Sequence, residues 1–247
     1  MTSVPDHLSI LQRHLGAIFA DRLQSLVAYG LHASAPPRSH QPAHGTADAA
    51  TRTSTLAIVT SLGESDLKAC AEHVATWHAA GLATPLLLAS GDFERSLDAF
   101  PLEFGAIIAD HVVVAGHDPF TGLEIDPGDI RRACEVQARS HLLHLRQGFL
   151  ETGGNGNALA MLTIRSAEPF AALITSIARL QGLATHDQSA VGRHAERQLQ
   201  LPPGVVTEVV ALAQATDISA ADAARIFPAY LDATERLVQY VDGWGTA

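Results

Sequence analysis

The stretch SLVAYGLHASAPPRSH, residues 25–40, holds the first residues whose types and spacing are relevant to chemistry. Its first six residues predict a short buried strand that ends in a glycine turn at Gly30, and such turns commonly bind phosphate. The following residues are rich in Ala, Pro, His and Ser, and no carboxylate occurs before Asp48. The segment therefore begins like a phosphate-binding turn but contains neither a helix N-terminus nor a glycine-rich cradle to complete one.

The histidines are the next candidates for chemistry, because thirteen of them occur in 247 residues. His32, His40 and His44 fall in a segment without a predicted element, so nothing would orient their imidazoles toward a metal ion. His141 and His144 are three apart on a predicted helix, where neighbouring leucines indicate edge positions of a packed helix. The sequence therefore predicts no metal site.

Composition excludes several classes of protein. The net charge of −10 argues against general binding to a nucleic acid polymer. No apolar run reaches about 18 residues, and the N-terminus lacks a basic region before its apolar positions, so neither a membrane span nor a signal peptide is predicted. Cys70 and Cys134 form no metal-binding or disulfide pattern, which is typical of a reduced compartment, and a cytoplasmic protein is expected.

The first half of the chain predicts a mixture of helices and strands. Apolar residues from Leu8 to Phe19 recur at helical spacing. Ser61 and Glu64 have the spacing of a capping box that would start a helix running to Gly81. The segment 31–53 contains three prolines and little that could pack, so a flexible loop is expected. Strands are predicted at about 24–29, 55–61, 83–90 and 111–116, and a short helix at 91–100.

The second half predicts only helices, the first of them capped by Asp126 with Pro127 in its first turn. The helices are expected at about 128–151, 157–182, 187–199, 204–215 and 219–242. The fold class is therefore α+β, with a small mixed β-sheet domain over 1–125 and an α-helical bundle over 126–247. The apolar segment 220–241 leaves a homodimer open as an alternative.

Several phrases carry a resemblance to a known family: LVAYG (26–30), TPLLLAS (84–90), SLDAFPLEF (96–104), VVVAGHDPF (112–120) and HLLHLRQGFL (141–150). They resemble the nucleotidyltransferase superfamily that includes the kanamycin-type antibiotic adenylyltransferases, in particular a bacterial subgroup of it. The resemblance implies a small mixed sheet followed by a helical bundle. It also implies a Gly-Ser turn after the first strand, an Asp-x-Asp pair on the next strand and a third acid on a later strand.

The chemistry that the resemblance implies depends on these carboxylates. Residues i and i+2 of a strand face the same side, so the acid pair presents its oxygens to one point. There it would hold Mg²⁺ against the phosphates of a nucleoside triphosphate. Here the turn is Gly30-Leu31, and the best placement puts Thr53 and Thr55 at the positions of the acids. Neutral hydroxyls are poor ligands for magnesium, so the catalytic site is predicted to be lost.

Three charged residues are the candidates for contacts with a ligand. Glu103 is the candidate third acid, with Asp110 near the same strand as the other possibility, although a surface acid beside a turn is the simpler interpretation. Arg139 and Arg146 are seven apart on one face of the first bundle helix. The resemblance implies that this helix faces a cleft, where both arginines could meet phosphates. The simpler interpretation is that they form ion pairs with acids of the N-terminal half.

Two functions are consistent with these observations. The preferred one is a non-catalytic, nucleotidyltransferase-like module, without a metal or other cofactor, that binds a nucleotide or small molecule in the cleft between the domains or acts in assembly. The alternative is an active transferase that uses Mg²⁺ and a nucleoside triphosphate to modify a small molecule. Its acids would be relocated, with Asp48 and Glu103 as the candidates.

Overall fold

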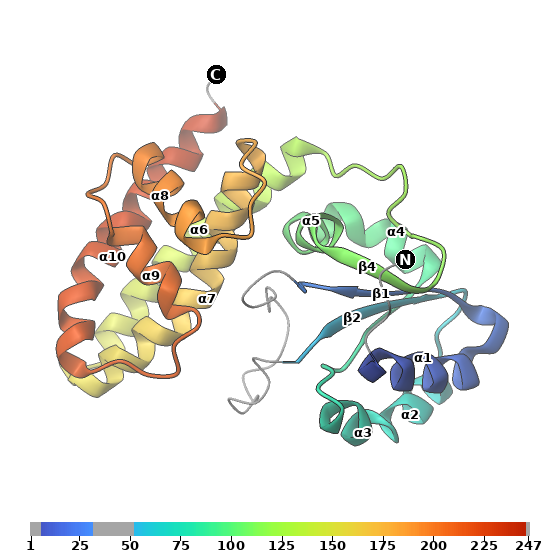
Figure 1. Ribbon diagram of the computed structural model, residues 1–247. Coiled ribbons are helices and arrows are strands. Elements are labelled where there is room, and N and C mark those ends of the chain that lie inside the picture. The colour runs from blue at the N-terminus through green and yellow to red at the C-terminus, as the bar shows by residue number, and fades with distance from the viewer. Residues whose placement is uncertain (1–5, 32–51, 246–247) are drawn as a thin grey trace. The chain divides into compact units, whose positions relative to one another are not determined.

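The computed structural model describes residues 6–31 and 52–245 of the chain (Figure 1). These residues form two compact units, the first ending at Ile125 and the second beginning at Asp126. Each unit has its own set of elements and its own apolar interior, so the two are described in turn. The predicted flexible loop at 31–53 lies almost entirely outside the described residues, as do His32, His40, His44 and Asp48.

The first unit is built on a mixed four-stranded sheet with the order β3-β2-β1-β4. The central strand β1 pairs antiparallel with both β2 and β4, whereas β2 pairs parallel with β3. The sequence-based prediction of four strands in a small mixed sheet is confirmed. The strands are β1 (Leu23–Tyr29), β2 (Ser54–Val59), β3 (Leu86–Ala89) and β4 (His111–Gly116).

Helices cover both faces of this sheet, as Figure 1 shows. On one face, apolar residues of α1 and Trp77 of α3 pack against Ala57 and Val59 of β2. On the other face, Phe93 of α4 and Phe104 of α5 pack against the intervening residues of β2. The helices of this unit are α1 (Asp6–Phe19), the 3₁₀ turn η1 (Ala20–Arg22), α2 (Glu64–Ala71), α3 (Val74–Ala79), α4 (Ser90–Ala99) and α5 (Pro101–Ala109).

Three local predictions for this unit were wrong or incomplete. The helix expected from 64 to 81 is divided into α2 and α3 by a turn at 72–73. The predicted capping box at Ser61 is also wrong, because the N-cap is Gly63, whose N–H donates to Asp66 Oδ2 at 3.0 Å. The helix α5 was not predicted. Its sequence, PLEFGAIIA, is so uniformly apolar that it shows little helical periodicity.

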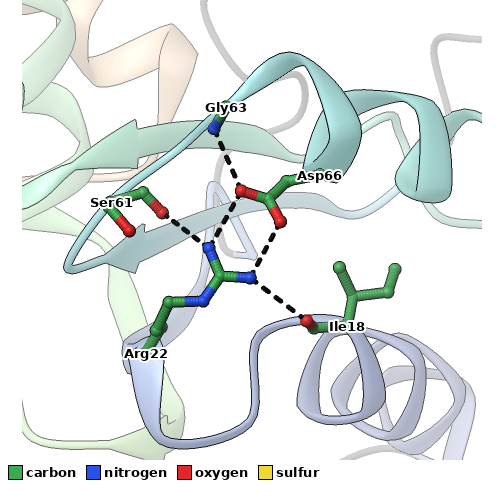
Figure 2. A network of polar contacts seen from close by, with 5 residues as sticks. All are labelled: Ile18, Arg22, Ser61, Gly63 and Asp66. Carbon is green, nitrogen blue, oxygen red and sulfur yellow. Dashed lines mark hydrogen bonds and ion pairs between the residues drawn. The ribbon is translucent and has the colours of Figure 1, made fainter.

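Arg22 connects the end of α1 to the start of α2 (Figure 2). Its guanidinium donates to both carboxylate oxygens of Asp66, at 2.9 and 2.8 Å, and also to the carbonyl oxygens of Ser61 and Ile18. These hydrogen bonds from Arg22, together with the one from the Gly63 N–H, lower the pKa of Asp66 to about 2. A bidentate pair of this kind fixes geometry as well as adding stability.

The second unit consists, among the described residues, of five α-helices and a short 3₁₀ turn. Asp126 caps the first helix as predicted, because its Oδ1 accepts a hydrogen bond from the Gly128 N–H at 2.7 Å. Every predicted helix in this half is confirmed, with ends that differ by three residues at most. The elements are α6 (Pro127–Glu151), α7 (Gly156–Leu180), α8 (Gln188–Gln198), α9 (Val205–Leu212), α10 (Ala220–Asp242) and η3 (Gly243–Gly245).

The interior of the second unit is formed mainly by α7 and α10. Among the described residues, α7 alone is long and apolar enough to qualify as a candidate membrane span. Part of this apolar surface packs inside the unit, where Phe170, Leu173 and Ile174 are buried within the bundle. The apolar side of α10 is likewise buried within the same unit, including Phe227 and Tyr230. This side is therefore not available to a second copy of the chain.

Replacing Asp66 with asparagine is expected to lower the thermal midpoint of the first unit by a few degrees, because Arg22 loses its bidentate partner. A carboxyl whose pKa is lowered in the folded state stabilises it above the unfolded pKa of about 4. The deficit of D66N relative to wild type should therefore shrink as the pH falls from about 4 to about 2.

Thermal melts followed by circular dichroism across this pH range would measure the effect. The matched control is D92N, since Asp92 forms an exposed pair with Arg95 within α4 that contributes little stability. Equal midpoints for D66N and wild type at neutral pH would contradict the stabilising role of the Arg22–Asp66 pair.

Candidate functional site

The candidate site lies at the end of the sheet where β1 stops and β2 and β4 start. The antiparallel pairing places Tyr29, at the end of β1, between Ser54 of β2 and His111 of β4. Gly30 follows with a φ of +69°, a left-handed conformation that glycine adopts without strain. Its N–H donates to the carbonyl oxygen of Asp110 at 3.0 Å. The predicted glycine turn therefore exists, and Leu31 after it is 39% exposed.

Thr53 and Thr55 face the side of the sheet that α1 covers. Residues i and i+2 of a strand face the same side of a sheet. Thr53 and Thr55 therefore face the same side as Ala57, which belongs to the apolar cluster on that face. Thr53 Oγ1 lies 3.3 Å from His7 Nε2 of α1, within hydrogen-bond distance. Thr55 is only 1% exposed, and its Oγ1 is buried with no hydrogen-bond partner among the described residues. One hydroxyl is thus engaged with a histidine, and the other is enclosed in the interior.

A second group of polar side chains lies on the opposite face at the same end of the sheet. Tyr29 forms a side-chain hydrogen bond with Ser54, and burial of its ring raises the pKa of its hydroxyl. His111 Nδ1 lies 3.1 Å from the carbonyl oxygen of Ile108, and its Nε2 lies 3.3 Å from Asp118 Oδ1. Sequence reasoning did not identify this group. The turn-rich phrase GHDPFTG after β4 was a signal for Asp118, but nothing linked it to His111.

The residues at the two positions expected for the acid pair do not fit a magnesium ion. Mg²⁺ requires octahedral oxygen coordination, usually including carboxylates, and loses its water reluctantly. Thr53 and Thr55 bring no negative charge, and the Thr55 hydroxyl is closed off from solvent. Within residues 6–31 and 52–245, no group of three His, Cys, Asp or Glu side chains is arranged to hold a metal ion. No catalytic step through magnesium can therefore be derived from these residues.

Glu103, the candidate third acid, lies in the first turn of α5, and Asp110, the other possibility, is the C-cap residue of the same helix and is 9% exposed. The neighbouring Phe104 packs on the face of the sheet opposite to the one that Thr55 faces. The structure therefore places α5 and the two threonines on different sides of the sheet and does not bring Glu103 to the position of the expected acid pair. Asp48, the other candidate acid, lies outside the described residues.

Arg139 and Arg146 of α6 are both exposed and both paired with acids of the second unit. Arg139 donates to Asp242 at 2.7 Å, and Arg146 donates to Glu235 at 2.9 Å. Their partners lie on or at the end of α10, not in the N-terminal half as the simpler sequence-based interpretation expected. Exposed ion pairs of this kind are weak, so a stronger anion could compete for either guanidinium. A role of these arginines in ligand binding stays a prediction.

A third polar cluster, which sequence reasoning also missed, joins α1 to α3. Trp77 Nε1 donates to His14 Nδ1 at 3.1 Å, and the His14 ring stacks on His73 with 4.0 Å between centroids. Burial, then the nearby His73, lowers the pKa of His14. The indole N–H requires a lone pair on Nδ1, so the cluster selects the neutral imidazole and serves to lock α1 onto α3.

Comparison of the whole structure with solved structures indicates a nucleotidyltransferase-like fold. The structure is similar to the crystal structure of spectinomycin adenyltransferase AAD(9) from Enterococcus faecialis with ATP and spectinomycin, with a TM-score of 0.57 and 10% sequence identity. The match covers 95% of this chain and 99% of that one. No protein-family model and no curated protein sequence matches the chain. At this level of identity the similarity establishes the fold and leaves the activity open.

Replacing Thr55 with valine is expected to raise the free energy of unfolding by about 1 kcal/mol. Valine has nearly the same shape, and its methyl group removes a buried hydroxyl that has no partner. Urea denaturation followed by circular dichroism would measure the change. T163V is the control, because the buried Thr163 hydroxyl donates to the Leu159 carbonyl oxygen at 2.8 Å and should gain nothing from removal. A loss of stability in T55V would show that its hydroxyl has a partner in solution.

Proposed function

We propose that this chain is a non-catalytic, nucleotidyltransferase-like protein that binds a nucleotide or another small molecule without transferring a nucleotidyl group. The fold similarity supports the first part of this proposal. The second part depends on the residues at the end of the sheet. This second part is the loss of metal-dependent chemistry. The fold by itself does not decide it, because the same fold is compatible with an active or an inactive protein.

The observation that carries the proposal is the environment of Thr55. A carboxylate at this position would have to reach solvent and phosphate, whereas the Thr55 side chain is buried beside Ala57 in the apolar cluster under α1. Thr53, two residues earlier, is within hydrogen-bond distance of His7. These positions carry no negative charge with which to hold a divalent cation between phosphates.

A binding function is supported by the polar side chains that lie at this end of the sheet. Tyr29, Ser54 and His111 lie side by side there, and a ligand could exchange hydrogen bonds with the Tyr29–Ser54 and His111–Asp118 pairs without requiring a metal ion. The location of a ligand between the two domains stays a prediction. Three further expectations also stay predictions: the cytoplasmic location, the bacterial origin and the absence of a nucleic acid or membrane partner.

The alternative of an active transferase finds less support among the described residues. It requires carboxylates that converge on one point, and Glu103 belongs to a helix on the face opposite to Thr55. An assembly role also stays open, but not through the apolar side of α10, which is buried within its own unit. A homodimer would need another surface, such as the exposed Val136, Leu143 and Leu150 on α6.

Transfer assays with α-³²P-labelled ATP, GTP and CTP in the presence of Mg²⁺ test the proposal directly. The acceptors would be a broad panel of small molecules, including spectinomycin because of the structural similarity. We expect no label to reach any acceptor, because the positions expected for the metal-binding acid pair carry Thr53 and Thr55 instead. Transfer that is lost in E103A or D48A, and kept in the exposed-acid control E124A, would instead establish the active alternative.

A further inference from the structure

The second unit contains a groove of about 490 Å³ between α6 and α7. A volume of this size is typical of sites for small molecules. Every residue that lines the groove belongs to α6, to α7 or to the turn between them, so none of them belongs to the first unit. Near the turn the two helices touch, because a Cβ on Gly148 would lie only 2.6 Å from Leu162 Cδ1.

Pro169 marks the other end of the groove. Proline has no N–H, so the carbonyl oxygen of Arg165, four residues earlier in α7, lacks its usual helical donor. The carbonyl oxygen of Ser166 accepts a hydrogen bond from the Tyr230 hydroxyl at 2.9 Å. One backbone hydrogen bond of α7 is therefore missing where the helix borders the groove. The carbonyl oxygens of Arg165 and Ser166 and the Tyr230 hydroxyl lie at this end.

A buried histidine gives this end of the groove a fixed polar wall. His141 Nε2 lies 2.7 Å from the Tyr230 hydroxyl, whose own hydrogen is used on Ser166. The imidazole must therefore donate from Nε2, which fixes its tautomer and ring orientation. Burial, with a contribution from the charge of His144, lowers the pKa of His141 to about 4, so the ring is neutral at pH 7.

Positive charge at this end comes from Arg165. Its side chain is exposed, lines the groove and forms no hydrogen bond or ion pair with another residue that the structure describes. Arg139 and Arg146, by contrast, are engaged by acids of α10. Ser140 and His144 line the groove on α6, one turn apart, and add donors of hydrogen bonds. An anionic group could therefore be held here without displacing an existing partner of Arg165.

The middle of the groove is apolar. Leu145 of α6 and Met161 and Leu162 of α7 line it, and Met161 is half exposed. Glu151 lines the end near the turn, where its carboxylate accepts a hydrogen bond from Gln147. A ligand with a second negative charge would meet this carboxylate, so the groove favours one anionic group joined to an apolar body.

We propose that the α6/α7 groove binds a small organic anion, with its carboxylate, sulfonate or phosphate group on Arg165 and its apolar body against Leu145, Met161 and Leu162. This site is additional to the proposed function and does not depend on it, because none of its residues belongs to the first unit. A chain that failed to bind any nucleotide could still bind such an anion.

The test uses 8-anilinonaphthalene-1-sulfonate, whose aromatic body carries one sulfonate and whose fluorescence rises in an apolar site. The full chain should bind one dye saturably. R165Q should weaken binding by at least about tenfold, because a charge-assisted hydrogen bond is lost. M161W should block binding by filling the groove. R193Q should bind like wild type, because Arg193 is an exposed residue of α8 that pairs with Asp187 and does not line the groove.

Competition then separates anion binding from simple apolar binding. Octanoate should displace the dye at least about tenfold more effectively than octylammonium, which has the same chain and the opposite charge. Circular dichroism would establish that each variant is folded. The proposal is overturned if wild type shows no saturable binding, if R165Q or M161W binds as tightly as wild type, or if the two competitors are equally effective.

Discussion

A divalent cation that bridges phosphates is held by anionic oxygens, and the two positions expected to supply them at one end of this sheet, Thr53 and Thr55, carry none. The pairing of β1 with both β2 and β4 brings the glycine turn, the start of β2 and the start of β4 together there. At the two positions where carboxylates would converge, one threonine contacts His7 and the other is enclosed under α1. The strand ends are therefore arranged as the family's fold requires, but the residues at the two expected positions supply no negative charge to hold a cation.

The rest of the first unit explains why this arrangement is stable. The sheet is covered on both faces, so the side chains of β2 alternate between two apolar clusters, and Thr55 falls in the one that contains Ala57. At the other end of the sheet, Arg22 fixes the connection from α1 to α2 through Asp66 (Figure 2). The Arg22–Asp66 ion pair thus stabilises the fold of this unit, whereas Thr55, at a position expected for a catalytic acid, is uncharged.

Local signals in the sequence predicted most of the helices and strands, whereas they predicted only part of the candidate site. The helices of the second unit were predictable because the Asp126 cap and breaks such as Pro202-Pro203 mark helix ends. The break between α2 and α3 has no glycine or proline to mark it, and α5 carries one charged residue, Glu103, among apolar ones and so shows little helical periodicity. Contacts such as Trp77 with His14 or His141 with Tyr230 join residues far apart in sequence, so they required the structure.

Isothermal titration calorimetry with ATP, in Mg²⁺ and separately in EDTA, measures most directly whether this protein handles phosphates through a metal ion. Without carboxylates to share the cation, magnesium has no additional ligand on the protein, and any affinity for ATP should be no greater in Mg²⁺ than in EDTA. Affinity that appears or tightens strongly only when magnesium is present would show that anionic oxygens converge on the cation after all, and would contradict the account.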